Sequence, residues 1–195
     1  MTSRPSVGSA IVIQGKFSFR AERDGSAAIT DTYNLQIVLP ESFPRDLPVV
    51  TELDFRIPRN GDHHINSDGS LCLGSPLRLL LELSKAPSLT GFSTRCLVPY
   101  LYAISHKLKL GGRLPLGELE HGRPGEVQDY CELFSLQRAG QVKQAMRLLG
   151  MKKRLANKQK CPCGCGNRLG RCQFNRKIRR LRKLATRRWF LSHQL

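Results

Sequence analysis

The segment "DHHINSDGSLCL", residues 62–73, places two histidines, a turn and one cysteine close together in the chain. A cysteine that transfers an acyl group must meet a bulky donor at the surface and must be partly ionised. The pair Asp68-Gly69 supplies a tight turn that would direct Cys72 outward. A cysteine between leucines is otherwise a common packing residue. The pattern around Cys72 favours a reactive thiol over a core position.

A second group of thiols lies in "KCPCGCGNRLGRCQFNRK", where glycines between the cysteines allow tight turns. Four thiolates at this spacing can surround a tetrahedral zinc ion, and such a site is structural because it leaves no open position for a substrate. The alternative is a set of free thiols in a flexible tail. The predicted ligands are Cys161, Cys163, Cys165 and Cys172.

Charge is distributed very unevenly along the chain. Residues 136–195 hold 18 of the 32 Lys and Arg residues and no Asp or Glu, whereas residues 1–135 hold 14 basic and 15 acidic residues. The basic region predicts contact with an acidic protein or with nucleic acid. In the alternative interpretation its basic residues form the solvated face of a helix that docks on its own domain. No base-reading motif accompanies them.

The sequence contains no segment of the length that a membrane span needs. No stretch approaches about 18 consecutive apolar residues, and the first twenty residues lack the apolar core of a signal peptide. We therefore expect a cytoplasmic protein without a membrane partner. Seven cysteines in that reducing compartment predict thiols and a metal site rather than disulfides.

The first half of the sequence predicts a β-meander. Residues 10–22 and 29–39 are rich in β-branched and aromatic residues, and residues 49–58 supply a third strand. Between the last two, residues 40–48 contain three prolines, so this segment should form an ordered loop without a helix. Three strands with short connections should pair antiparallel.

Helical patterns follow Cys72. Residues 90–111 place apolar side chains on one face, with Gly111 as a stop signal and Pro99 as a start or a kink. Residues 124–153 form a second helical region with a possible break near Gly140, and residues 175–195 fit one basic helix. The predicted apolar face of the first helix consists of Phe92, Cys96, Leu97, Tyr100, Leu101, Ile104 and Leu108.

Strands followed by helices predict an α+β fold, with the helices gathered on one side of an antiparallel sheet. Two further cysteines lie among leucines and aromatics on the predicted helix faces, and we expect both to be packing residues. They are Cys96 and Cys131.

The segments "YNLQIVLPESFPRDLPVV", "INSDGSLCL" and "APSLT", in this order, resemble the core of the ubiquitin-conjugating (UBC-like) enzymes. These carrier enzymes receive a ubiquitin-like protein from an activating enzyme. The resemblance covers roughly residues 10–110 and is most specific in "INSDGSLCL". It implies a UBC-like meander with a crossing helix, and it matches Cys72 with the catalytic thiol and Leu73 with the residue beside it.

The sequence departs from that family just before the cysteine. The family's His-Pro-Asn tripeptide corresponds to Asp62, His63 and His64 and is therefore missing. His64 stands where an asparagine shapes the loop and polarises the thioester, so His64 or the loop N–H groups are the candidates to stabilise the oxyanion. Asn66 lies nearby and is a further candidate, although it matches a different family position. The family's N-terminal helix is absent or very short.

The segment "LPLGELEHGRPGEVQDYCELF" is similar to a segment of bacterial UBC-like proteins, some of which are encoded beside antiphage signalling systems. Its glycines predict an ordered loop whose Glu118, Glu120 and His121 reach the active site and take the proton of the attacking amine. The alternative is that these three residues are structural. The resemblance further implies a role in antiphage defence, with a nucleotide cyclase as a possible target.

The cysteine cluster resembles the SEC-C zinc motif, which reads Cys-x-Cys, eight residues, and then Cys followed by Cys or His. Cys161, Cys163 and Cys172 fit that spacing. Gln173 stands at the place of the fourth ligand, and Cys165 is the candidate replacement. Together the two resemblances divide the chain into a UBC-like catalytic domain (residues 1–135), a basic helical connector (136–160) and a zinc motif with a basic helix (161–195).

The leading hypothesis is a bacterial conjugating enzyme. In it Cys72 carries a ubiquitin-like protein, or the C-terminus of a partner protein, as a thioester and passes it to an amine, with an activating enzyme as a possible further partner. One alternative is a UBC-like binding module without transfer activity, and another is a zinc-containing nucleic-acid-binding protein. A Cys/His hydrolase is the weakest reading, because no residue that would orient the histidine stands out.

Overall fold

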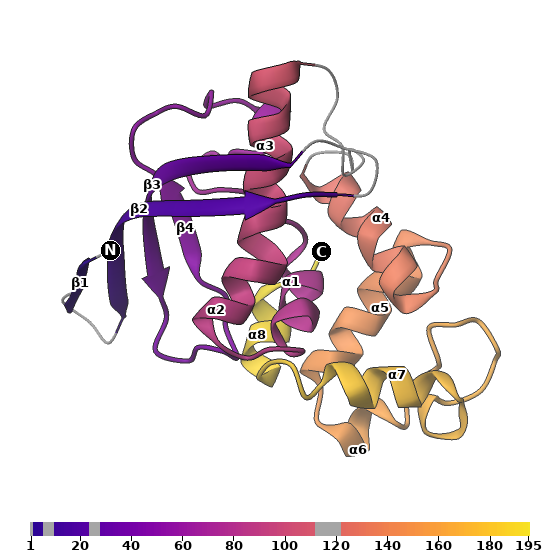
Figure 1. Ribbon diagram of the computed structural model, residues 1–195. Helices are drawn as coiled ribbons and strands as arrows, with labels where there is room; N and C mark the ends of the chain where they lie inside the picture. The colour runs from indigo at the N-terminus through magenta and orange to yellow at the C-terminus, as the bar shows by residue number, and fades with distance from the viewer. Residues whose placement is uncertain (1, 6–9, 24–27, 112–121) are drawn as a thin grey trace. The chain divides into compact units, whose positions relative to one another are not determined.

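The computed structural model describes residues 2–5, 10–23, 28–111 and 122–195, and these fall into two compact units (Figure 1). The first unit is Met1–Gly74 with Glu82–Glu118, and the second is Ser75–Leu81 with Leu119–Leu195. The helix over residues 123–134 groups with the second unit, whereas the sequence analysis assigned it to a domain of residues 1–135. As functional limits, the boundaries at residues 135 and 160 stay predictions.

The first unit contains an antiparallel sheet of the order β1-β2-β3-β4, with strands β1 (Thr2–Pro5), β2 (Ile11–Ala21), β3 (Ile29–Leu39) and β4 (Val49–Glu52). The long hairpin pairs Ile11 with Leu39 and Ala21 with Ile29. This confirms the antiparallel meander over residues 10–22 and 29–39. Strand β1 was not predicted, because "TSRP" has no apolar alternation and forms only by pairing with β2.

The fourth strand ends earlier than predicted, at Glu52 rather than near residue 58. Glu52 is buried, and its carboxylate accepts hydrogen bonds from the backbone N–H groups of Asp54 (2.9 Å) and Ile57 (3.4 Å). Phe55 adopts a left-handed backbone with φ of 54°. A strand cannot continue through that conformation, so the chain turns around the Glu52 carboxylate.

The predicted helix over residues 90–111 forms as three consecutive helical segments. These are α2 (Leu89–Phe92), a π turn η2 (Ser93–Leu97) and α3 (Val98–Leu110), followed by Gly111 with φ of 72°. Pro99 lies in the first turn of α3, directly after the π turn, where its missing N–H group is accommodated. The predicted face is buried except at Leu108, which is exposed.

Helix α3 packs against β2 and β3 (Figure 1). Its Ser105 Oγ lies 2.7 Å from the hydroxyl of Tyr33 on β3, and both side chains are buried. This hydrogen bond joins the helix to the sheet and satisfies the buried phenol. Two shorter elements were not predicted. The 3₁₀ turn η1 (Gly61–His63) precedes Cys72 in the sequence, and the helix α1 (Pro76–Leu83) follows it.

The second unit is helical, with α4 (Arg123–Phe134), α5 (Ala139–Gly150), α6 (Lys153–Ala156), η3 (Leu169–Arg171), α7 (Phe174–Leu181) and α8 (Arg187–Ser192). The break between α4 and α5 falls at Ser135, which has a left-handed φ of 55°, rather than near Gly140. Buried Asp129 of α4 accepts hydrogen bonds from Ser75 and from Arg78 Nε (2.5 Å). These bonds tie the start of α1 to α4.

The single basic helix predicted over residues 175–195 is wrong. Helix α7 ends at Leu181, and α8 begins only at Arg187 after Thr186. Thr186 is extended, and its hydroxyl accepts the backbone N–H of Trp189 at 3.2 Å, so it caps a new helix. Ile178 and Leu181 of α7 and Trp189 of α8 are buried, so each of the two helices has an apolar side.

Within the described residues, every helix is too short or too polar to cross a membrane.

Candidate functional site

Backbone hydrogen bonds hold the chain at Cys72 to the preceding loop and to strand β4. The N–H group of Cys72 donates to the carbonyl of His64 at 2.7 Å, and Leu71 N–H donates to the carbonyl of Val50 on β4 at 2.8 Å. Ile65 and Leu71 form an isolated antiparallel bridge. His64 has a left-handed backbone with φ of 53°, which turns the chain at the corner of this loop. The loop of residues 64–72 is therefore a small closed hairpin anchored to the sheet.

The tip of this hairpin is the turn predicted from Asp68-Gly69. Gly69 has φ of 81° and donates its N–H to the carbonyl of Asn66, and Asn66 N–H donates to the carbonyl of Ser70. The Asp68 carboxylate accepts the N–H (2.9 Å) and hydroxyl (2.6 Å) of Ser70, and these hydrogen bonds hold the pKa of Asp68 below its usual range. The turn is confirmed.

Asn66 lies in the turn at the tip of the hairpin and is not next to Cys72 in the sequence. Its side-chain amide donates to the hydroxyl of Ser70 at 2.9 Å. This bond stiffens the hairpin tip, as an Asx-type contact does in other turns. The structure thus gives Asn66 a contact that shapes the loop; its predicted part in the chemistry stays a prediction.

Tyr100 of α3 was missed as a site residue. Its hydroxyl donates to the carbonyl of His63 at 2.8 Å and lies 3.4 Å from that of His64. Burial raises the pKa of the Tyr100 phenol, and the thiol of Cys72, which is close enough to interact with it, raises that pKa further. The sequence analysis placed Tyr100 on the core face, and the rule that a buried phenol needs a partner was the available signal.

Two cations also hold the loop. Arg59 donates to the carbonyl of Gly69 and to the carbonyl of Glu52, both at 2.6 Å, and its guanidinium lies 4.6 Å from the ring centre of Phe55. Lys107 Nζ donates to the carbonyl of Asp62 at 2.8 Å. Neither residue belongs to a recognisable motif, so nothing in the sequence pointed to them.

His63 is half-buried rather than fully solvated. Its Nδ1 lies 2.7 Å from the side-chain oxygen of Asn60. Burial lowers the pKa of His63, and the charge of Lys107 lowers it further. A neutral imidazole is therefore favoured beside the loop at pH 7.

Cys72 is half-buried, in contrast to the buried Cys96. Burial raises the pKa of Cys96 to about 11, so that thiol is unreactive at neutral pH. The burial of Cys96 agrees with its predicted packing role. Cys131, for which the same role was predicted, is only half-buried. The structure brings Cys72, His64 and Asn66 together on one hairpin. The predicted Glu118, Glu120 and His121 lie outside the described residues.

The four cysteines near the C-terminus lie together. All four sulfur atoms lie within 4.8 Å of one another. The sulfur of Cys172 lies 3.6 Å from those of Cys163 and Cys165, near the edge of about 3.8 Å that a tetrahedron with Zn–S bonds of about 2.3 Å would have. A soft, tetrahedral metal ion fits this set, and the geometry includes Cys165, the proposed replacement for Gln173.

Backbone hydrogen bonds and backbone conformation determine the shape of the loop that holds these thiols. Cys161 N–H donates to the carbonyl of Asn167 at 2.9 Å, and Phe174 N–H points at the sulfur of Cys172 at 3.4 Å. Gly164 and Gly166 both have positive φ, near 80°, which the turns between ligands require. Backbone N–H groups that point at sulfur stabilise thiolates, the form that binds metals.

Ionisation differs among these thiols. Burial raises the pKa values of Cys161 and Cys163, while hydrogen bonding by the Asn167 backbone lowers the pKa of exposed Cys165 to about 7. Cys165 therefore loses its proton more readily than Cys161 or Cys163. A metal ion that meets this cluster would find one ligand ready in the thiolate form.

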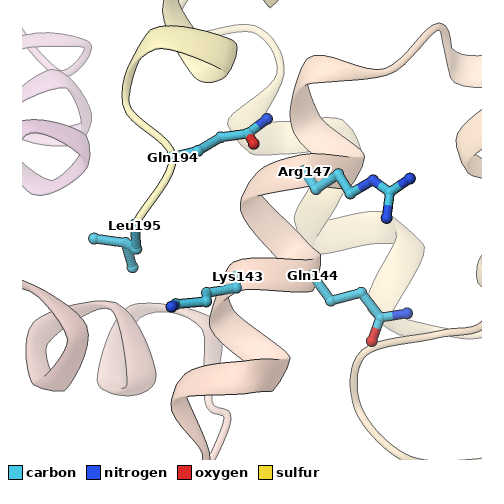
Figure 2. Close-up of a pocket in the computed structure, with 5 residues that line it drawn as sticks. All are labelled: Lys143, Gln144, Arg147, Gln194 and Leu195. Carbon is cyan, nitrogen blue, oxygen red and sulfur yellow. The ribbon is translucent and has the colours of Figure 1, made fainter.

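The second unit also has a surface hollow of about 330 Å³, between α5 and the end of the chain (Figure 2). Lys143, Gln144 and Arg147 line it from α5, and Gln194 and Leu195 line it from the C-terminal residues. Its lining includes no thiol, histidine or acidic side chain. The hollow is therefore lined by basic, amide and apolar side chains only.

Comparisons with protein-family models, with curated proteins and with solved structures gave no match to this chain.

Proposed function

We propose that this chain is a cysteine-dependent acyltransferase of the ubiquitin-conjugating type. Cys72 accepts the C-terminal acyl group of a ubiquitin-like protein, or of a partner protein, as a thioester and passes it to an amine. The observation that supports this most directly is the half-buried residue Cys72 at the end of a hairpin whose backbone is held by His64, Val50 and Tyr100. A rigid loop keeps a nucleophile in place for a bulky donor.

The reaction has two steps. In the first, the Cys72 thiolate attacks the donor's thioester carbon, the new C–S bond forms, and the donor's thiolate leaves. In the second, an amine attacks the Cys72 thioester, the C–S bond breaks, and the amide forms. The amine's proton passes to a base, for which the 118–121 segment remains the candidate, and the sulfur leaves as thiolate.

An oxyanion forms in both steps and needs hydrogen-bond donors. His64 is the proposed side-chain donor, and it follows directly on the turn η1 with a left-handed backbone. A comparable donor in other acyl-transfer enzymes contributes about 3 kcal/mol to the transition state. Replacing His64 by Ala should therefore slow the transfer by about 100-fold while Cys72 still forms the thioester.

The order of elements supports the same proposal. An antiparallel meander leads into the cysteine hairpin, and the helix α3 then crosses the sheet and contacts the hairpin through Tyr100. This order agrees with what the UBC-like resemblance implies. The role in antiphage defence, the nucleotide cyclase target and the need for an activating enzyme rest on the resemblance alone.

A test that needs no activating enzyme uses ubiquitin carrying a C-terminal thioester of mercaptoethanesulfonate as the acyl donor. We expect an adduct on a non-reducing gel that dithiothreitol removes. The Cys72→Ser variant should give either no adduct or one that resists dithiothreitol, because an oxygen ester replaces the thioester. The Cys131→Ser variant, which alters another half-buried thiol, should behave as the unchanged protein.

Two results would contradict the proposal. One is an adduct of equal yield in the Cys72→Ala variant, which would place the acyl group elsewhere. The other is the absence of any adduct both with ubiquitin thioester and with the proteins encoded beside this one in its genome. That second result would favour the inactive binding module.

We further propose that the metal of the cysteine cluster is zinc and that its role is structural. Four sulfur ligands match the preference of zinc, and they leave no coordination position for water or substrate. Cys161, Cys163, Cys165 and Cys172 would hold the ion. Metal analysis of the purified protein should give one zinc per chain, and a Cys172→Ser variant should lose it.

A further inference from the structure

The last 60 residues of the second unit, 136–195, carry a large positive charge and no acidic side chain. All 18 Lys and Arg residues of the segment 136–195 are within the described part of the chain, and no acidic side chain occurs in that segment. The ion pairs of the described residues involve Arg56, Arg78, Lys85, Arg95 and Lys109, none of which belongs to it. Within the described residues, these 18 charges are therefore not neutralised by carboxylates of the chain itself.

Part of this charge forms a regular row on α7. Arg176, Arg179 and Arg180 of α7 are exposed and recur at spacings of three and four residues, and exposed Lys183 lies just beyond the end of the helix, while Ile178 and Leu181 are buried. From Arg176 to Arg180, at a rise of about 1.5 Å per residue, the row extends for about 6 Å. That length corresponds to about two phosphate spacings of one nucleic-acid strand, which are about 3.4 Å each along the helix axis.

Further exposed cations surround this row in the sequence. Arg168 and Arg171 flank η3 in the loop of the cysteine cluster, and Lys143 and Arg147 line the hollow beside the C-terminal residues (Figure 2). A cluster of exposed cations repels itself, so its assembly on one unit favours an anionic partner.

The exposed side chains distinguish between two kinds of anionic partner. Protein interfaces contain aromatic anchors that lose their contact with water on binding. In the second unit Trp189 and Phe190 are already buried, and among its described large apolar side chains only Leu155 and Leu191 are exposed. The surface thus offers charge and almost no apolar contact area, which suits phosphates better than an acidic protein.

We propose that the second unit binds the phosphate backbone of nucleic acid without sequence preference. Arg outnumbers Lys among its cations, and Arg forms paired hydrogen bonds with phosphate oxygens. Its buried aromatic rings are not available to stack on bases, so contact with the backbone is the main source of affinity. This proposal does not depend on the transferase activity of Cys72.

The test measures binding of the full chain to a fluorescent 20-base-pair DNA duplex of random sequence, by fluorescence anisotropy at several KCl concentrations. The first variant combines Arg176→Gln, Arg179→Gln and Arg180→Gln. Its matched control removes the same charge from exposed positions of the first unit with Lys16→Gln, Arg20→Gln and Arg45→Gln. Circular dichroism melting confirms that both variants are folded.

We expect the α7 variant to bind at least 10-fold more weakly and the control to change by less than 2-fold. The slope of log affinity against log salt should fall by about 2.7 in the α7 variant, because about 0.9 counterions are released per phosphate contact on a duplex. The Cys72→Ser variant should bind as the unchanged protein does. A duplex of different sequence should bind with the same affinity.

Three results would overturn the proposal. The first is equal weakening in the α7 and control variants, which would mean that only total charge matters. The second is displacement of the duplex by poly-glutamate at the same concentration of negative charge as by unlabelled DNA, which would indicate an acidic protein partner. The third is no binding at 50 mM KCl.

Discussion

In the first unit one half-buried thiol, Cys72, ends a hairpin whose shape is determined by backbone hydrogen bonds and by Tyr100. In the second unit four thiols lie within 4.8 Å of one another on one loop. A single thiol without other thiols nearby stays available for reaction, whereas four thiols that lie close together are suited to bind a metal ion. The two regions therefore show cysteine in two chemical settings within one chain.

The two units also differ in how many of their charged side chains form ion pairs. In the first unit Asp31 pairs with Arg56 and Lys109, and Glu82 pairs with Lys85 and Arg95. In the second unit the cations of residues 136–195 make no ion pair among the described residues. Four cations of the first unit are thus paired within it, whereas in the second unit only Arg78 is paired among the described residues, with Asp129 and Glu132.

The largest effect should follow from removing a metal ligand in the second unit. We expect Cys161→Ser to lower the free energy of unfolding of this unit by several kcal/mol, because structural zinc sites contribute about 10 kcal/mol or more to folding. The chain's single tryptophan, Trp189, is buried in α8 and reports on this unit through its fluorescence in urea. Cys72→Ser should leave the transition unchanged, and an equal shift in both variants would remove the distinction between the two kinds of thiol.

A smaller effect, of about 100-fold in rate, should separate Cys72 from Cys96 within the first unit. Burial raises the pKa of Cys96 to about 11, more than two units above an ordinary thiol, so its thiolate is scarce at pH 8 and increases only as the pH rises toward 11. Alkylation by iodoacetamide, followed by peptide mass spectrometry, measures both sites in one sample. If Cys72 reacted as slowly as Cys96, its assignment as an accessible nucleophile would fail.

Neutralising Asp31 should have an effect of about 1 kcal/mol that depends on pH. The Arg56 guanidinium holds the pKa of Asp31 far below its usual range, so the pair stabilises the folded state above pH 5. This stability is lost progressively as the pH falls below about 5 toward the lowered folded pKa. The estimate is modest because Arg56 is partly exposed to solvent.

Urea unfolding of Asp31→Asn, followed by circular dichroism, should show a larger loss at pH 7 than at pH 3. The exposed Asp62→Asn is the matched control and should have little effect at either pH. A loss that does not change with pH would mean that Asp31 acts through packing rather than through charge.

An effect of similar size on stability should come from Tyr100→Phe. Loss of the hydrogen bond to the carbonyl of His63 should cost about 1 kcal/mol of stability and change the alkylation rate of Cys72 by less than 10-fold. Tyr33→Phe removes another buried hydrogen bond, to Ser105, and should lower stability similarly without affecting Cys72. Equal changes in the Cys72 rate would show that Tyr100 has no special relation to the hairpin.

Much of the fold was predictable because it depends on local patterns. The alternation in residues 10–22 and 29–39 and the Asp68-Gly69 turn gave strands and a hairpin tip at the right places. The apolar face of α3 was predictable for the same reason. The failures are equally specific: Glu52 ends β4 early, and Thr186 starts a new helix inside a periodic basic segment. Both depend on one polar side chain that accepts backbone hydrogen bonds.

The sequence by itself determined which groups are available: a lone cysteine after a turn, four cysteines at metal-binding spacing, and an excess of cations without acidic residues in the last third. Spacing and composition are properties of the chain and need no coordinates. Only the tertiary structure decided that Cys165 joins the other three thiols and that Tyr100 and Arg59 hold the Cys72 hairpin. The Tyr100 contact joins residues 37 apart in sequence, and the contacts of Cys165 and Arg59 depend on loop geometry that exists only in the folded chain.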